Sequence, residues 1–170
     1  LADAETRALK GGANRDRALT AAYDYFYNGP IGQEMVRHST ATGGWLRMED
    51  LRAYRPMWVE PVATTYRGLD VVCAPLTSRT GLETCEQLNI LEGFDIASMK
   101  PDSPQALHLI AEAIKITKAD VYRYAADPAS RPAPVSTLIS KDFAAQRRRL
   151  IDLNRAIAFP EGAAIGNAPP

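Results

Sequence analysis

The sequence predicts an α+β fold that is rich in helices and contains one β-hairpin. Residues 103–128, SPQALHLIAEAIKITKADVYRYAADP, form its longest periodic segment, because apolar side chains recur there every three or four positions. Two β-branched, apolar runs, residues 62–66 and 69–74, flank Arg67-Gly68, a two-residue turn of the kind that hairpins favour. These patterns predict one long helix and one hairpin in the same fold.

The long helix has a signal at each end. Ser103 can cap the first backbone N–H groups, Pro104 suits the first helical position, and Pro128 forces the residue before it out of helical geometry. The spacing predicts an apolar face made of Leu107, Ile110, Ala111, Ile114, Thr117, Val121 and Tyr124. Such a face must pack against a sizeable neighbour.

The hairpin strands are expected around residues 57–66 and 69–74, in a sheet that helices over residues 81–92 and 104–126 cover. Further helices are predicted to start at Asn14 or Asp16, at Pro30, at Met48 and after Ser140, the last one running through KDFAAQRRRLIDLNRAI.

The length and composition of the chain predict a single domain over residues 1–170. The chain has 20 basic and 20 acidic residues, so its net charge gives no reason to expect nucleic acid as a partner. No apolar run reaches the roughly 20 residues that a membrane span needs. Residues 156–170 are rich in Gly, Pro and Ala and are expected to form an irregular tail.

The arginine run 147–149 lacks interleaved aromatic residues, so we interpret it as a solvated helix face.

His108 and Glu112 lie four positions apart on one helix face, with Asp120 two turns farther on. A catalytic zinc site needs a third ligand and an open position, so we interpret the pair as surface or buried hydrogen-bonding groups. We expect neither a metal nor a cofactor. His38 and His108 are the two histidines, and no Ser or Cys lies in a nucleophile signature, so we assign no catalytic residue.

Cys73 and Cys85 are the two cysteines, twelve positions apart. This spacing fits neither a zinc knuckle nor a CxxC redox motif. Two core thiols are therefore favoured over a single disulfide, which stays the alternative.

The segment between the hairpin and the helix 81–92 is the best candidate for ligand contact. Ser78 and Thr80, with Thr77, bring hydroxyl groups to a helix N-terminus, and Arg79 adds a positive charge. Ser78, Arg79 and Thr80 are our candidate substrate-binding residues. Two structural alternatives stand beside this reading, because a Ser or Thr here is more often a helix cap and Arg79 can pair with Glu83.

Several motifs follow one another in a familiar order: GGWLRMEDLRAY, PVATTYRGLDVVCAP, LNILEGFD, HLIAEAIKITKADVYRYAADP and VSTLISKDFAAQRRRLID, together spanning roughly residues 14–153. In this order they resemble the C-terminal part of the large subunit of the gamma-glutamyltransferase (gamma-glutamyltranspeptidase) family. One departure is the loop from Ala74 to Gly81, where the family usually carries Pro-Pro-Ser-Ser-Gly-Gly and this chain has the bulky Arg79.

The resemblance implies part of an N-terminal nucleophile hydrolase, an αββα sandwich made by a precursor that cleaves itself. It implies a partner, the small subunit, whose first residue is the nucleophilic threonine, and a gamma-glutamyl small molecule of the glutathione type as substrate. It also suggests a periplasmic or secreted location, which nothing else in the sequence addresses. The alternatives are a relative acting on other acyl amides and a non-catalytic structural or binding module.

Overall fold

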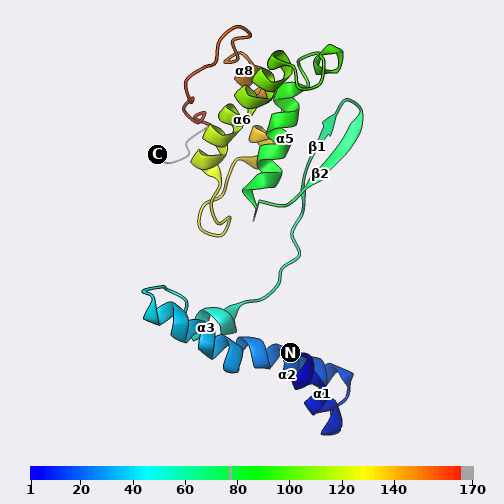
Figure 1. The fold of residues 1–170 in the computed structure, drawn as a ribbon, viewed down its shortest axis with the longest axis vertical. Helices are drawn as coiled ribbons and strands as arrows, with labels where there is room; N and C mark the ends of the chain where they lie inside the picture. Colours follow the sequence, from blue (N-terminus) through cyan, green and yellow to red (C-terminus); the bar gives the residue numbers. More distant parts are fainter. Residues whose placement is uncertain (77, 166–170) are drawn as a thin grey trace. The chain divides into compact units, whose positions relative to one another are not determined.

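The computed structural model of the protein describes residues 1–76 and 78–165 (Figure 1). Contacts within the chain divide it into two compact units, Leu1–Trp58 and Val59–Pro170, and each is described here by itself. The single domain over residues 1–170 therefore stays a prediction.

The first unit consists of helices α1 (Ala2–Lys10), α2 (Arg15–Tyr27), α3 (Pro30–Ala41) and α4 (Met48–Ala53). The predicted start signals are confirmed, since the Asn14 side chain accepts a hydrogen bond of 3.0 Å from the Arg17 N–H and Pro30 is the first residue of α3. The rings of Tyr27 and Tyr54 stack at 5.6 Å, which ties α2 to the end of α4. Helix α1 was not predicted.

The second unit begins with the predicted hairpin, made of β1 (Val62–Tyr66) and β2 (Leu69–Cys73). The strands pair antiparallel, and Arg67 and Gly68 between them have φ angles of 50° and 83°. Two positive φ angles in a two-residue turn are typical of type I′, whose twist matches that of the strands. The first strand starts at residue 62 and not at 57, because Val62 already pairs with Cys73, the last residue of β2.

Helix α5 (Arg79–Leu91) is the central element of this unit. It lies against both strands on one side, while α6 (Pro104–Tyr124) and α8 (Lys141–Arg148) pack on it from other sides (Figure 1). We expected both long helices to cover the sheet. Instead α5 covers the hairpin, and α6 packs mainly on α5. The short elements η1 (Ile96–Ser98) and α7 (Val135–Leu138) complete the unit.

The ends of α6 are as predicted, and its buried face is as predicted only in part. The Ser103 side chain accepts a hydrogen bond of 3.3 Å from the Ala106 N–H, and Pro104 is the first helical residue. Leu107 and Ile110, predicted to face the core, are 52% and 39% exposed. The buried side chains are Ala106, Leu109, Glu112, Ala113, Ile116, Thr117, Ala119, Asp120, Val121 and Tyr124. Thr117, Val121 and Tyr124 are buried as predicted. The rest of the predicted face is displaced because the buried side also contains the acidic Glu112 and Asp120, which an apolar count assigns to solvent.

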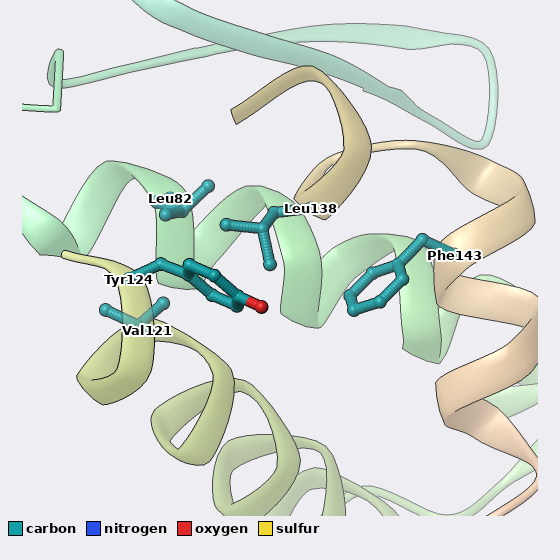
Figure 2. Close-up of a cluster of buried hydrophobic side chains, with 5 residues drawn as sticks. All are labelled: Leu82, Val121, Tyr124, Leu138 and Phe143. Carbon is teal, nitrogen blue, oxygen red and sulfur yellow. The ribbon is translucent and has the colours of Figure 1, made fainter. Parts of the chain in front are cut away.

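A cluster of buried side chains joins four helices (Figure 2). It contains Leu82 from α5, Val121 and Tyr124 from α6, Leu138 from α7 and Phe143 from α8. The Tyr124 ring lies among these apolar side chains, and its hydroxyl donates a hydrogen bond of 2.7 Å to the carbonyl of Ala163.

The C-terminal segment lacks helices and strands over residues 156–165 but is anchored to α6. The Ile165 N–H donates to the Tyr124 hydroxyl at 2.7 Å, and the Lys115 ammonium donates to the Ile157 carbonyl at 2.7 Å. Helix α8 ends at Arg148, so the predicted continuation of this helix toward residue 157 is wrong. Within the described residues, none of the helices combines the length and the apolar character that crossing a bilayer requires.

Candidate functional site

The candidate site is the loop that joins β2 to α5. The Ser78 N–H donates a hydrogen bond of 2.8 Å to the Pro75 carbonyl, which turns the chain into the helix. Gly81 lies against the preceding strand end, where an added Cβ would come within 2.0 Å of the Ala74 carbonyl oxygen. A side chain at position 81 would therefore push the helix away from the strand. Thr77, which we predicted to belong to the site, lies outside the described residues.

Ser78 and Thr80 stand together at the start of α5. Ser78 is the N-cap residue by position, yet its side chain makes no cap hydrogen bond. Its hydroxyl instead lies 2.7 Å from the Thr80 hydroxyl, and either group can be the donor. The alternative in which a Ser or Thr of this loop caps the helix is thus not met by the Ser78 side chain, because the neighbouring hydroxyl group is its partner.

Arg79 lies beside α6 with about half of its side chain exposed. Its Nε is 3.9 Å from a Glu83 carboxylate oxygen, and its guanidinium stands over the Tyr122 ring at 5.1 Å. Lys118 approaches the same carboxylate to 3.7 Å. Arg79 also lines an open cavity of about 220 Å³ with Leu76, Ala125 and Ala126. Both predicted partners of Arg79, the neighbouring carboxylate and a ligand, are therefore compatible with its position.

A buried acidic group, Glu86, lies on α5 behind the loop, and sequence reasoning missed it. Glu86 is fully buried, and neither of its carboxylate oxygens has a hydrogen-bond partner of suitable geometry among the described residues. Burial, and next the nearby Asp120 carboxyl, raise the pKa of Glu86 to about 10. Glu86 is therefore uncharged at neutral pH. Its place halfway between the inward Leu82 and Ile90, at four-residue steps, was the available signal.

The polar groups considered for a metal do not converge. His108 Nε2 lies 2.8 Å from the Asp152 carbonyl, and Glu112 pairs with Lys115 at 2.5 Å and accepts from the Ile157 N–H at 3.2 Å. Both groups thus hold the C-terminal segment, in line with their interpretation as hydrogen-bonding residues. Across residues 1–76 and 78–165, no three His, Cys, Asp or Glu side chains are grouped so that they could hold a metal ion.

The arginine run was interpreted as a solvated face, and this is wrong for two of its three members. Arg147 Nε donates to Asp120 at 2.7 Å, and Arg148 donates to the carbonyls of Ile90 and Asn89 at 2.8 and 2.9 Å. These carbonyls belong to the last turn of α5, where free acceptors attract a cation. Only the third arginine of the run, Arg149, is exposed.

The LNILEG motif forms a polar junction between the hairpin, α5 and α8. The Asn89 amide donates to the Ile139 carbonyl at 2.6 Å, and its oxygen accepts from Thr64 at 2.8 Å and from Lys141 at 2.6 Å. Glu92 accepts from Lys141 at 2.6 Å and from the turn N–H of Arg67 at 2.7 Å. The hydrogen bond from Lys141 and that from Arg67 hold the pKa of Glu92 below its usual value.

Gly93 completes this junction. An added Cβ would come within 1.8 Å of the Arg148 guanidinium, which is already held by the end of α5. The motif residues therefore hold the hairpin and α8 at the C-terminal end of α5, the opposite end from the loop.

Comparison with known proteins identifies the scaffold. The family model described as gamma-glutamyltranspeptidase matches residues 17–168. The chain belongs to the gamma-glutamyltranspeptidase family. The resemblance predicted from the motifs is thus confirmed, and the junction at Asn89 and Glu92 is the structural basis of one of these motifs.

Relatives in this family include an acylase and a glutathione hydrolase. The chain is 39% identical to the acylase ACY 1 proenzyme of Pseudomonas sp. (strain SE83), over 85% of this chain and 26% of the relative. It is 35% identical to the glutathione hydrolase proenzyme of Escherichia coli (strain K12), over 78% of this chain and 23% of the relative. The chain thus spans about a quarter of the length of these relatives.

A solved structure from the family has the same fold over most of this chain. The gamma-glutamyltranspeptidase of Helicobacter pylori matches with a TM-score of 0.72 and 26% sequence identity, covering 85% of this chain and 43% of that chain. The relatives named above are enzymes, and two of them are named as proenzymes.

Proposed function

We propose that this chain is the large-subunit portion of a gamma-glutamyltransferase-like enzyme that cleaves gamma-glutamyl amides of the glutathione type. The observation that carries the proposal is the family match over residues 17–168, joined to relatives named as proenzymes. The enzyme transfers the acyl group to water or to an amine.

The nucleophile of the proposed reaction is a threonine at the start of the separate small subunit. A hydroxyl nucleophile needs an adjacent base, and an N-terminal threonine has one in its own α-amino group. The described residues of this chain supply scaffold contacts instead, as Asn89 and Glu92 illustrate. The small subunit is therefore the proposed partner, and acyl transfer proceeds through an acyl-threonine.

The hairpin is the proposed attachment to the rest of an αββα sandwich. One face of the hairpin lies on α5, while Val72, which pairs with Ala63 on the opposite face, is 67% exposed. Exposed apolar side chains on a strand favour burial against another layer. In the complete enzyme, strands of the second sheet then cover this face.

Arg79 is the proposed determinant of substrate choice in this chain. Its guanidinium lies beside an open cavity, and Ser78 and Thr80 add hydroxyl groups next to it. An arginine can pair with a substrate carboxylate through two parallel hydrogen bonds. The loop would then favour acyl donors that carry a negative charge.

A second candidate function is the cleavage of other acyl amides, which the 39% identity to an acylase proenzyme favours. The bulky Arg79 in a loop where the family usually carries small residues is consistent with a changed acyl group. The non-catalytic alternative remains a structural or binding module.

The test compares Arg79→Ala with Arg149→Ala in the complete two-subunit enzyme. Donors with and without a free carboxylate are assayed side by side. We expect Arg79→Ala to raise KM for the anionic donors alone, while the exposed Arg149 serves as the matched control for loss of one charge. Unchanged kinetics with every donor would make Arg79 a structural residue. Preference for an uncharged acyl amide in the parent enzyme would favour the acylase function.

A further inference from the structure

Helix α5 presents Gly81, Cys85 and Asn89 at four-residue spacing along one face. Gly81 meets the strand end, since its added Cβ would lie 2.0 Å from the Ala74 carbonyl oxygen. Eight residues farther along the helix, Asn89 accepts a hydrogen bond of 2.8 Å from Thr64 in β1. Cys85 therefore lies between two close contacts of the helix with the hairpin.

Cys73 occupies the matching position on the hairpin. It directly precedes Ala74, and it pairs with Val62, which is buried, so this pair faces the helix. Two residues earlier, Val71 pairs with Thr64, the partner of the asparagine on α5. Four helical residues rise about 6 Å, and two strand residues rise about 6.8 Å. The distance along α5 from Cys85 to Asn89 therefore nearly equals the distance along β2 from Cys73 to Val71. Cys73 and Cys85 thus stand opposite each other.

The two thiols differ in access. Cys85 is fully buried, whereas Cys73 is partly exposed, and both are free thiols. Burial, and next the adjacent Cys73 thiol, raise the pKa of Cys85 to about 12. This influence of one thiol on the other supports their proximity, and the difference in exposure makes Cys73 the thiol that a reagent meets first.

We propose that Cys73 and Cys85 form a redox modification site, at which a small-molecule disulfide converts the two thiols into an intramolecular disulfide. This goes beyond the proposed function, which gives the thiols no part. The bond would link β2 to α5 and close a ring around Ser78, Arg79 and Thr80. Both ends of the candidate loop would then be covalently fixed.

The reaction is two successive thiol–disulfide exchanges. The Cys73 thiolate attacks one sulfur of the reagent, which forms a mixed disulfide and expels the first thiolate. Cys85 then loses its proton, and its sulfur attacks the Cys73 sulfur and expels the second thiolate. Two protein thiols are oxidised, one reagent disulfide is reduced to two thiols, and the protons of the cysteines end on those thiols.

The test treats the folded chain with bis(2-hydroxyethyl) disulfide, an uncharged reagent, and then labels remaining thiols with a maleimide under denaturing conditions. We expect loss of both labelled thiols and no retained reagent. Trypsin cuts after Arg79, between the two cysteines, so the peptide ending at Arg79 should remain joined to the peptide beginning at Thr80 until a reductant is added. The oxidised chain should also melt at a higher temperature than the reduced chain.

Two single variants provide the controls. Cys85→Ser should stop at the mixed disulfide and keep one reagent group on Cys73. Cys73→Ser should leave the buried Cys85 unmodified while folded, and it serves as the test if the other variant does not fold. Persistence of both thiols in the parent chain, a stable mixed disulfide there, a disulfide between two chains, or a lowered melting temperature on oxidation would each overturn the proposal.

Discussion

Arg147 and Asp120 form a buried ion pair between α8 and α6, with 2.7 Å between the arginine Nε and a carboxylate oxygen. The aspartate side chain is fully buried and the arginine side chain is 11% exposed. The same carboxylate accepts the Ala163 N–H, and the same guanidinium donates to the Glu161 carbonyl at 3.1 Å. The pair therefore holds two helices and the C-terminal segment together.

Replacing Arg147 should lower the free energy of unfolding substantially. Arg147→Ala leaves the Asp120 carboxylate buried without its cation, which typically destabilises a protein by about 3–5 kcal/mol. Urea unfolding measures this loss. The control is Arg149→Ala, which removes an exposed arginine two positions farther along the chain. It should change the free energy of unfolding by less than about 0.5 kcal/mol. Equal effects of the two variants would contradict the assigned role of the pair.

The phase of α6 can be tested with two isoleucines of the same helix. Ile116 is fully buried and packs with Ile90 and Ala113, while Ile114 is only half-buried. Ile116→Ala should cost about 2–5 kcal/mol of unfolding free energy, because it removes buried methylenes and leaves a cavity. Ile114→Ala should cost clearly less. A larger loss for Ile114→Ala than for Ile116→Ala in denaturant melts would show that the face predicted from the sequence is the buried one.

Glu86 should make stability depend on pH. Its pKa is raised to about 10 in the folded chain, so above the ordinary value of 4.5 the unfolded chain releases a proton that the folded chain keeps. The free energy of unfolding therefore falls as pH rises through this window. Glu86→Gln removes the effect, and its advantage over the parent should grow by at most about 1.4 kcal/mol per pH unit.

The measurement compares unfolding free energies of parent and variant at pH 5.5 and at pH 8.5. Glu60→Gln, which changes an exposed glutamate at the start of the same unit, is the control and should show no growing difference. A constant difference between Glu86→Gln and the parent across this range would show that Glu86 titrates normally.

Local signals account for what was predictable in the fold. Arg67-Gly68 specifies its turn through two positive φ angles, and Ser103 caps α6 with its own side chain, so the hairpin and this helix start follow from neighbouring residues. The buried face of α6 does not, because Glu112 and Asp120 each accept a hydrogen bond from a residue far along the chain, Ile157 and Arg147, 45 and 27 positions away.

The candidate site divides in the same manner. The position of Ser78, Arg79 and Thr80 at the start of α5 could be predicted from the polar run before a periodic segment. The pairing of the two hydroxyls, and the place of Arg79 over Tyr122, depend on side-chain geometry and on a second helix. Neither the hydroxyl pairing nor the contact between Arg79 and Tyr122 can be predicted from sequence spacing.

The most direct test of the account measures release of p-nitroaniline from gamma-glutamyl-p-nitroanilide by this chain alone, by the threonine-led small subunit alone and by the complete processed enzyme. Acyl transfer needs a nucleophile, a base and oxyanion donors, and the proposal puts the first two on the small-subunit threonine. We predict turnover by the complete enzyme and none by this chain. Turnover by this chain alone, or a complete enzyme that stays active when the threonine is replaced by alanine, would contradict the account.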